Sequence, residues 1–421
     1  MAYTSDRLLD SSSTTEPVQP QIQPQNLPTN LKVSLMVSDL SQQGAGRWGG
    51  AVRPFLLAAA LEQCGCQVKI FGFNFGEAAV LPSEKWAIAT IPGHPYPRFV
   101  RSAQQLLQQI DGDILYAYKP KPTSFGIGLL QKLRTGRPLI LDIDDWELSW
   151  HGGDAYRYGL TPKQLARDVL KPNGALRNPD HPLYLRGMEK LVSRADAVTV
   201  HTQFLKQRFG GEYVPNGKDL SLFNPERHDP QALKARYGLA AYRVLMFPGA
   251  PRPYKGVEDV LMALEQLNQP DLRLVIVGGS PYDDYDQQLQ HQWGRWLIKL
   301  PKIPHAQMPE VIAAADAIVV PQRDTPAAQA QFPLKLTDGM AMAKPVLATR
   351  VGDIPEILGD TGYLVDPGSP QQLATGIQTL FADLEAAAAQ GRRAREKCRM
   401  QYSIEAMAKT LSNTLASVLV P

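Results

Sequence analysis

Short apolar, β-branched runs alternate with stretches of helical periodicity along this chain, and this alternation limits its fold more than any other feature. The pattern is typical of a parallel sheet covered by helices, because every strand must return through a crossover. The runs form two series, separated by a Pro-, Asn- and Asp-rich connection over residues 214–230 that we interpret as an interdomain linker. The sequence predicts strands at residues 32–38, 67–73, 113–117, 138–143 and 196–201, and then at residues 243–247, 272–277, 317–320, 346–349 and 363–365.

The length of 421 residues exceeds one ordinary core, and the 44% of apolar residues suffice for two. We therefore predict an α/β protein with two doubly wound, Rossmann-like domains that face each other across a cleft, where ligand binds. The expected parts are a disordered Ser-, Thr-, Pro- and Gln-rich tail over residues 1–30, an acceptor-side first domain over 31–215 with a returning helix at 402–421, and a nucleotide-binding second domain over 216–401.

Composition argues against several classes of function. The formal net charge of +3 comes from interspersed residues of both signs, so we expect no nucleic-acid binding. The cysteines Cys64, Cys66 and Cys398 are too few for a disulfide framework or a zinc site and indicate a reducing compartment. The sequence contains neither a signal-peptide core nor a run of about 18 apolar residues. We expect a cytoplasmic protein without a metal or a cofactor of its own.

A first candidate phosphate site lies in the sequence FPGAPRPYKG, residues 247–256, where an apolar strand turns into a helix. Gly249 occupies the turn, and Arg252 and Lys255 precede the helix. Anions bind at helix N-termini, because unpaired N–H groups and the helix dipole favour negative charge there. The alternative explanation is a solvated turn in front of a helix.

A second motif, FPLKLTDGMAMAKPVLAT, follows at residues 332–349. Pro333 suits the first helical position, and Lys335 and Asp338 share one helix face because they are three residues apart. A surface ion pair, worth about 0.2–0.5 kcal/mol, is the alternative. Against it, Asp338 stands beside Gly339, where a ligand can approach closely. Two cations and an acid that can bind a diol suit a sugar nucleotide.

These two motifs, the continuation of the second through residue 367, and the sequence VPNGKDLSLFNP at residues 214–225 closely resemble the retaining GT-B glycosyltransferases related to sucrose and glycogen synthases, the glycosyl transferases group 1. The resemblance covers most of residues 31–419 and is most specific in the second half. It implies that Arg252 and Lys255 hold the diphosphate of a nucleotide sugar, that Lys335 and Asp338 bind the donor, Asp338 through its ribose hydroxyls, and that the base packs around Ile303.

The chain departs from the family pattern at three positions. Ala330 replaces the acid that contacts the donor sugar, eight residues before Asp338. Asp338 itself is shortened from the usual Glu, and Arg252 is closer to Lys255 than the commoner spacing. The long Arg252 side chain can still reach a phosphate with its two-pronged guanidinium. The resemblance therefore predicts the phosphate and ribose contacts, whereas the sugar contacts are where this chain differs.

In the first half, the family places a glycine-rich loop after the first strand, and GRWGGAVRPF at residues 46–55 fits it. Gly49 and Gly50 are the nearest matches, because glycine lets the backbone approach a phosphate. Arg53 then starts a helix predicted over residues 51–63 and is a candidate contact to donor or acceptor.

The strand at residues 138–143 is followed by Asp144, at the position where the family often has a histidine, and by Asp145. A carboxylate there can bind a sugar hydroxyl or stabilise oxocarbenium-like charge, so both are candidate catalytic residues. The alternative is that these acids only cap the end of a strand. His201, at the end of the next predicted strand, is a weaker candidate, since a lone histidine is more often structural.

Three other functions remain as alternatives. Residues 44–49 match the dinucleotide pattern GxGxxG of a nicotinamide dehydrogenase, but no acid ends the second predicted strand. The acids Asp142, Asp144 and Asp145 could bind Mg²⁺ in a GT-A transferase, although that fold needs no second sheet with its own phosphate motif. A GT-B protein that binds a sugar nucleotide without transferring it would explain Ala330.

The prediction is a retaining, metal-independent glycosyltransferase that moves a sugar from a nucleoside diphosphate donor to an acceptor hydroxyl. Its donor base, donor sugar, acceptor and oligomeric state do not follow from the sequence. The basic residues Lys119, Lys121, Lys132, Arg134 and Arg137 bracket an apolar stretch at residues 125–130. This arrangement favours a solvated face, with peripheral contact with the inner face of a membrane as the alternative.

Overall fold

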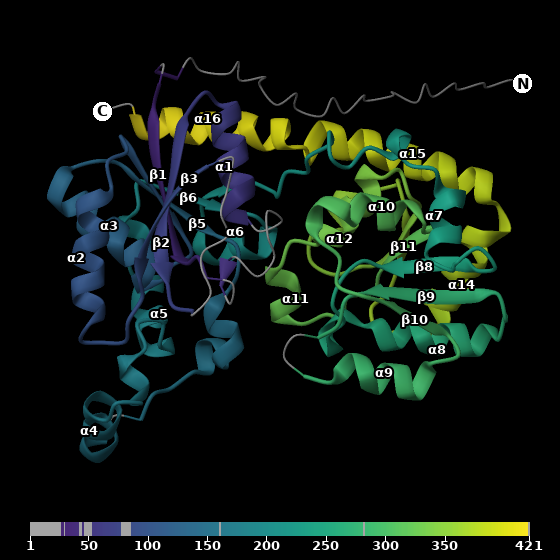
Figure 1. Ribbon diagram of the computed structural model, residues 1–421, viewed down its shortest axis with the longest axis horizontal. Coiled ribbons are helices and arrows are strands. Elements are labelled where there is room, and N and C mark those ends of the chain that lie inside the picture. The colour runs from purple at the N-terminus through teal and green to yellow at the C-terminus, as the bar shows by residue number, and fades with distance from the viewer. Residues whose placement is uncertain are drawn as a thin grey trace, which may run out of the picture.

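The computed structural model of the chain has two parallel sheets side by side, each with helices on both faces (Figure 1). The structure describes residues 27–28, 30–41, 44–45, 53–76, 86–159, 161–280 and 283–419. The tail predicted over residues 1–30 therefore lies almost wholly outside the described residues, as do Gly49 and Gly50.

The first sheet has the strand order β3-β2-β1-β4-β5-β6-β7, and all its neighbouring strands are parallel. The order reverses between β1 and β4, and ligands of such sheets bind beside this reversal, at the carboxyl ends of the strands. The strands are β1 (Lys32–Asp39), β2 (Gln67–Asn74), β3 (Ala87–Pro92), β4 (Ile114–Tyr118), β5 (Leu139–Ile143), β6 (Ala197–Val200) and β7 (Glu212–Tyr213).

Two apolar clusters cover the faces of this sheet. One unites α1 with the C-terminal helix α16, and the other lies under α2 and α3 on the opposite face. The helix α4 projects away from the body of this domain (Figure 1). The helices are α1 (Arg53–Gln63), α2 (Phe99–Gln109), α3 (Ile127–Thr135), α4 (Pro162–Leu170), α5 (Pro182–Glu189) and α6 (Gln203–Phe209).

The second sheet has the order β10-β9-β8-β11-β12-β13 and is also parallel throughout. Its reversal lies between β8 and β11, so the turn after β8 is a favoured position for a ligand. The strands are β8 (Arg243–Phe247), β9 (Leu272–Val277), β10 (Leu297–Leu300), β11 (Ala317–Val320), β12 (Val346–Thr349) and β13 (Tyr363–Val365).

The second sheet is covered by helices on both faces as well. The cluster on one face includes residues of α10, α12 and α15, and the cluster on the other includes residues of α8, α9 and α14. The helices are α7 (Pro230–Arg236), α8 (Val257–Leu267), α9 (Tyr285–Trp293), α10 (Met308–Ala313), α11 (Pro326–Ala330), α12 (Leu334–Ala341), α13 (Ile354–Leu358), α14 (Pro370–Ala382), α15 (Leu384–Gln401) and α16 (Ile404–Leu419).

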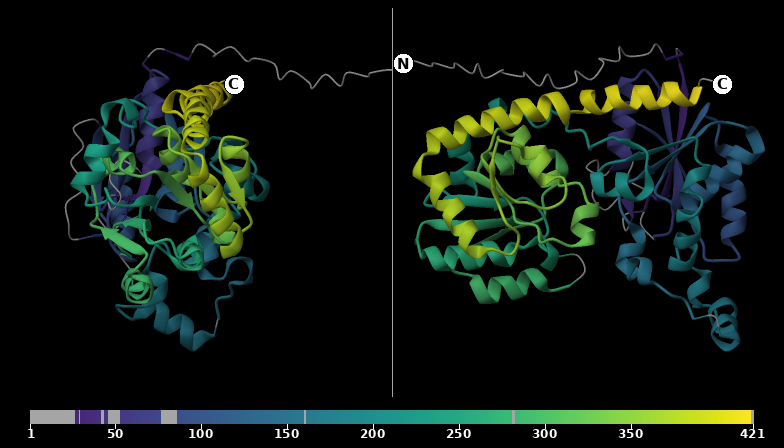
Figure 2. Two further views of the ribbon diagram at one scale, coloured as in Figure 1. Left: turned by 90° about the vertical axis from the view of Figure 1, so that its right-hand side faces the viewer. Right: turned by 180° about the vertical axis from the view of Figure 1, so that it is seen from behind.

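The chain crosses between the domains twice, and the two crossings lie together. Lys218 in the linker donates its N–H to the carbonyl of Tyr402 (2.7 Å), and Ile404 donates to the carbonyl of Lys218 (3.1 Å). From there α16 returns to the first domain and buries Met407, Leu411 and Leu415 against α1. The helices α15 and α16, in yellow, run along the same side of both domains (Figure 2).

The predicted fold class is confirmed, and most strands fall where the periodicity places them. In the second series, β8, β9, β11, β12 and β13 have the predicted bounds. The missed strands β3, β7 and β10 all lie at the edges of their sheets. Edge strands are paired on one side only and keep exposed residues, so their sequences carry a weaker apolar signal.

Candidate functional site

The turn after β8 brings Lys335 of α12 against Gly249. Gly249 has φ 148°, and a Cβ on this residue would lie 2.8 Å from Cε and 3.2 Å from Nζ of Lys335. Only glycine therefore allows the ammonium group to lie against the backbone at this turn. The two motifs that the sequence places 80 residues apart meet here.

Lys255, at the end of the short helix Pro253–Lys255, completes a cluster of half-buried cations with Lys335. Burial, then the neighbouring Lys335, lowers the pKa of Lys255 well below its usual value. Burial likewise lowers the pKa of Lys335. Within the described ranges, neither ammonium group forms an ion pair with a carboxylate. The folded chain thus holds two desolvated cations together, an arrangement that an anion between them would stabilise.

Arg252 lies at the edge of this cluster, where its Nη1 donates to Oδ2 of Asp283 (3.3 Å). Its charge also lowers the pKa of Lys255, after burial and Lys335. The helices α8 and α12 start beside the cluster, and neither has a side chain that caps its first N–H groups. The structure therefore brings together Gly249, Arg252, Lys255 and Lys335, which the sequence proposed for one diphosphate.

Asp338 has a partner that the sequence did not predict. Its Oδ1 accepts a short hydrogen bond from Nζ of Lys218, and both side chains are largely buried. The predicted alternative, an ion pair of Asp338 with Lys335, is therefore wrong. Lys218 belongs to the interdomain linker, so the proposed ribose-binding acid is tied directly to the crossing between the domains. Ile303, the proposed base contact, packs half-buried against the core beside α10 and α12.

Ala330, where the family pattern has an acid, is sealed between the domains. Its side chain is fully buried and packs in the apolar cluster of the first domain. Its carbonyl lies 3.2 Å from Nε2 of His201. A carbonyl can only accept, so Nε2 carries the proton, and Nδ1 then accepts from Nδ2 of Asn216 (3.3 Å). Burial, followed by the charge of Arg53, lowers the pKa of His201 to about 3, which fits a structural residue.

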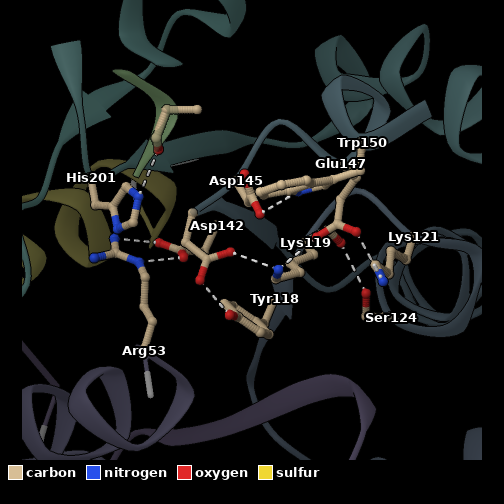
Figure 3. A network of polar contacts seen from close by, with 12 residues as sticks. Arg53, Tyr118, Lys119, Lys121, Ser124, Asp142, Asp145, Glu147, Trp150 and His201 are labelled. Carbon is tan, nitrogen blue, oxygen red and sulfur yellow. Dashed lines mark hydrogen bonds and ion pairs between the residues drawn. The ribbon is translucent and has the colours of Figure 1, made fainter. Parts of the chain in front are cut away.

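In the first domain, Arg53 is committed to a buried ion pair with Asp142 (Figure 3). Its Nε and Nη2 donate to the two carboxylate oxygens of Asp142 (2.6 and 2.7 Å), and its Nη1 donates to Asn216 (2.8 Å). Thr199 adds a hydrogen bond to Oδ2 of Asp142 (2.6 Å). Each of the three guanidinium nitrogens of Arg53 donates to a protein group, and the side chain is buried, so the structure does not support the predicted contact of Arg53 with a donor or acceptor.

Asp144 is also held by its own domain. The Tyr118 hydroxyl donates to Oδ2 of Asp144, and the Lys119 ammonium lies 3.4 Å from Oδ1. Lys119 has φ 73°, a left-handed conformation that is uncommon outside glycine. This backbone is fixed by Ser124, whose hydroxyl donates to the Lys119 carbonyl (2.9 Å). The conformation turns the Lys119 ammonium toward the carboxylates at the end of β5.

Glu147 connects this group to a second lysine. Its carboxylate oxygens lie 2.6 Å from Nζ of Lys119 and 3.1 Å from Nζ of Lys121. Burial alone would raise the pKa of Glu147, but the two ammonium groups outweigh it and lower the pKa to about 2. The sequence missed this residue, and it assigned both lysines to a basic surface. In the structure, Lys119 and Lys121 are engaged in ion pairs, and Phe125 between them and α3 is fully buried, so these residues form no exposed patch. Membrane contact through the other basic residues of the run stays a prediction.

Asp144 and Asp145 each have a buried Oδ1 without a hydrogen-bond partner among the described residues, but only that of Asp144 lies beside the Lys119 ammonium. The other oxygen of Asp145, Oδ2, accepts from Nε1 of Trp150 (3.0 Å). Burial raises the pKa of Asp145 to about 6. The Trp150 ring is 47% exposed and meets the ring of Tyr254, next to Lys255, with 6.1 Å between centroids. Asp145 and Trp150 thus lie where the first domain faces the cation cluster.

The positions of these residues at the carboxyl ends of neighbouring strands could have predicted that they lie together. Tyr118 is the last residue of β4 and Lys119 follows it, and Tyr118 pairs with Asp142 near the end of β5, at the same edge of the sheet. Parallel neighbours place such residues together whatever their separation in sequence.

For metal binding, the described ranges contain no group of three or more His, Cys, Asp or Glu side chains that could hold an ion. Metal-independent transfer stays a prediction. Likewise, no described helix is both long and apolar enough to cross a bilayer.

Comparisons with known proteins agree with this geometry. Residues 242–383, which include the cation cluster, match the model of the family described as glycosyl transferases group 1. Over 226 residues the chain is 29% identical to a GDP-mannose-dependent α-(1-6)-phosphatidylinositol monomannoside mannosyltransferase of Mycolicibacterium smegmatis, which covers 50% of this chain and 59% of the relative. Over 374 residues it is 27% identical to a D-inositol 3-phosphate glycosyltransferase of Mycolicibacterium gilvum, which covers 82% of this chain and 80% of the relative.

Solved structures extend the likeness to both domains. The Anabaena protein HepE, in complex with UDP and glucose, aligns with 92% of this chain and 100% of its own at a TM-score of 0.68 and 20% identity. Sucrose-phosphate synthase from Thermosynechococcus elongatus aligns with 92% of this chain and 98% of its own at a TM-score of 0.67 and 18% identity. At these identities the likeness establishes the GT-B fold alone, which excludes the GT-A alternative. The chain therefore has the GT-B fold, and its residues 242–383 are similar to the glycosyl transferases group 1.

Proposed function

We propose that this protein transfers a glycosyl residue from a nucleoside diphosphate sugar to a hydroxyl group of an acceptor, with retention of the anomeric configuration. The observation that carries the proposal is the cation cluster at Gly249, in which the half-buried Lys255 and Lys335 lie together without an ion pair to a carboxylate in the described part of the chain. A diphosphate supplies the missing negative charge. The uncapped starts of α8 and α12 add N–H donors for its oxygens.

The relatives support a nucleotide sugar and a hydroxyl-bearing acceptor. By its name, the M. smegmatis relative depends on GDP-mannose and acts on a phosphatidylinositol monomannoside, and the M. gilvum relative acts on D-inositol 3-phosphate. HepE has been solved with UDP-glucose. These names make GDP-mannose and UDP-glucose the first donors to test, and inositol or sugar hydroxyls the first acceptors.

The mechanism that we propose needs no protein nucleophile. The bond between the anomeric carbon and the diphosphate oxygen breaks while the acceptor oxygen bonds to the same face of that carbon. The proton of the acceptor hydroxyl passes to the departing phosphate oxygen. Arg252 and Lys255 stabilise the charge that develops on the diphosphate, in place of a metal ion. Closure of the domains would keep water away from the reacting carbon.

We assign the contacts to the ribose and the sugar to carboxylate oxygens that can still accept a hydrogen bond. Lys218 contacts Oδ1 of Asp338, so a ribose hydroxyl would bind through Oδ2. Ala330 is buried and brings no polar side chain to the sugar. Asp145, whose Oδ1 is unpaired within the described ranges, is our candidate for a sugar hydroxyl or for the oxocarbenium-like charge. Asp144, held by Tyr118 and Lys119, would act mainly by orienting this region.

One observation favours a second function, a GT-B protein that binds a sugar nucleotide without transferring it. The Ala330 position is closed against the first domain and lacks the acid that would hold the donor sugar. In that case the cation cluster would still bind the diphosphate, but no glycoside would form.

Thermal unfolding of the purified chain with UDP, GDP, ADP and their sugars tests the proposal. We expect one nucleotide series to raise Tm, by an amount that follows RT ln(1 + [L]/Kd). The same donor should then yield a glycoside that keeps the donor's anomeric configuration by NMR, with a chelator present. Asp338→Ala should mainly weaken donor binding. Stabilisation without any transfer would support the non-catalytic function, and no stabilisation by any nucleotide would refute both.

A further inference from the structure

The helix α4 has its polar and apolar residues reversed relative to a normal surface helix. Its single buried residue is the acid Asp168. Leu165, Val169 and Leu170 are instead 42%, 48% and 76% exposed. A surface helix of a globular protein normally turns its apolar stripe toward the core. Three large apolar side chains on a nine-residue helix are therefore left to contact something outside this domain.

This orientation is fixed by polar contacts with Asp168. Nε of Arg167 donates to Oδ1 of Asp168 (2.7 Å), and the hydroxyl of Tyr158 donates to Oδ2 (2.6 Å). Thr161 caps the helix through its side chain, which accepts from the N–H of Gln164. Arg167 belongs to α4 itself, so the hydrogen bond from Tyr158 is the contact that ties Asp168 to the chain outside the helix and leaves the apolar side chains exposed.

The surroundings of α4 are strongly basic. The segment over residues 156–178 has five basic residues, Arg157, Lys163, Arg167, Lys171 and Arg177, and one acid, Asp168. This excess of four compares with a formal net charge of +3 for the whole chain. The side chains of Lys163 and Lys171 are exposed at the two ends of α4, beside the apolar residues.

The position of α4 leaves this surface accessible. The helix lies at the end of a segment that projects from the first domain, on the side of the molecule opposite α15 and α16 (Figures 1 and 2). The helix forms the convex tip of this projection (Figure 1). A convex tip is suited to a deformable, extended surface.

We infer that α4 docks the protein onto an anionic lipid membrane. Leu165, Val169 and Leu170 enter the boundary between headgroups and acyl chains, while Lys163 and Lys171 contact anionic headgroups, the arrangement that holds interfacial helices at a bilayer. A second copy of the chain is a poorer occupant. A symmetric contact would bring two basic tips together, and three side chains fall far short of the roughly 800 Å² that a stable interface buries on each partner.

Flotation of the full-length chain with vesicles tests the inference at near-physiological salt. We expect binding to vesicles that contain phosphatidylglycerol, little binding to pure phosphatidylcholine, and weaker binding as salt rises. The triple variant Leu165→Ser, Val169→Ser, Leu170→Ser should lose roughly tenfold or more of its partitioning. The double variant Lys163→Gln, Lys171→Gln should lose about thirtyfold, at about fivefold for each charge near an anionic surface.

The matched control is Leu384→Ser with Met400→Ser, which removes two exposed apolar residues of α15 at the other side of the molecule and should bind like the parent. Equal binding of the α4 variants and the parent would overturn the inference. Loss of vesicle binding in Leu133→Ser, on α3, would also overturn it. The same holds if the parent is a dimer that binds no lipid and the triple variant is a monomer. Because α4 is remote from the cation cluster, the nucleotide-induced rise in Tm should survive in every α4 variant, which separates this inference from the proposed function.

Discussion

The two sides of the site handle buried charge in opposite ways. In the first domain, Arg53 is paired with Asp142, and Glu147 is held between two lysines. In the second domain, Lys255 and Lys335 lie together, and neither pairs with a carboxylate in the described part of the chain. The pKa values reflect this contrast, because Glu147 is stabilised in its charged form whereas Lys255 is destabilised in its charged form.

This difference distinguishes charged residues that stabilise the fold around the site from charged residues that bind a ligand. A network whose charges are already compensated gains little from a ligand and would lose stability if one member were removed. A group of like charges, by contrast, is held in place at a cost that an anionic ligand relieves. We therefore interpret the first domain's network as the rigid wall of the site, with Asp145 and Trp150 at its surface, and the second domain's cations as the donor's binding site.

The largest expected effect is on stability, and it tests the supporting role of the first domain. Arg53→Ala should lower the free energy of unfolding by about 3–5 kcal/mol, because it leaves the buried Asp142 carboxylate without its partner. Chemical denaturation measures this change. The control Arg399→Ala removes an ion pair with Glu396 in which both side chains are exposed, and it should cost far less. A stable Arg53→Ala protein that has lost only donor binding would instead favour the ligand contact first predicted for Arg53.

The next effect is on binding and transfer, and it tests the second domain. Lys255→Ala should lower kcat by roughly 10²–10³-fold, because it removes a preorganised cation at the leaving diphosphate. The Tm without nucleotide should stay the same or rise, since the variant also removes a desolvated charge that Lys335 repels. The control Lys397→Ala removes a lysine of α15 that bonds the Glu356 carbonyl. A Lys255→Ala protein that unfolds more easily but keeps full transfer would reverse the contrast between the two domains.

The smallest effect concerns Asp145, which lies between the two regions. Burial raises its folded-state pKa to about 6 from the ordinary value of 3.8, so the native state binds more protons than the unfolded chain between these pH values. The contribution of Asp145 to stability is therefore present at low pH and is lost as the pH rises through that window. As the pH rises from 4 to 7, the free energy of unfolding of Asp145→Asn should increase relative to that of the parent by about 1–2 kcal/mol. Chemical denaturation at each pH measures this difference.

Asp353 provides the control for this measurement, because burial raises its pKa to about 6 as well, at a site where it accepts from the N–H of Gln203. Asp353→Asn should change the pH dependence of stability but leave the pH profile of transfer alone. Asp145→Asn should change both if Asp145 contacts the sugar. An unchanged transfer profile in Asp145→Asn would move Asp145 from the binding site into the supporting network.

Much of the site was predictable because its parts are local. The turn at Gly249 with Arg252 and Lys255, and the helix start with Lys335, can each be recognised within ten residues of sequence. Their meeting followed from the parallel order of the strands, which alternating periodicity predicts. The edge strands β3, β7 and β10 were missed because their burial, and hence their apolar signal, is weaker.

The errors concern partners that only folding brings together. The sequence predicts that Lys119 and Lys121 belong to a basic surface. In the structure, Lys119 has a left-handed backbone conformation, and both lysines form ion pairs with Glu147, which follows β5. Arg53 read as a ligand contact, yet its guanidinium is satisfied by Asp142, 89 residues away. Side chains of this length reach several alternative partners, so sequence alone does not select among them.

The sequence by itself determined the two parallel sheets, the turn at Gly249, the cations around it and the loss of an acid at Ala330, because periodicity and motif spacing are properties of neighbouring residues. Only the tertiary structure decided that Asp338 bonds Lys218, 120 residues away, and that Ala330 packs against the other domain. It also decided that α4 buries Asp168 and exposes its leucines. In a buried site each charge must find a partner or remain costly. Which partner it finds depends on the packing of whole domains, and that information is not local to any motif.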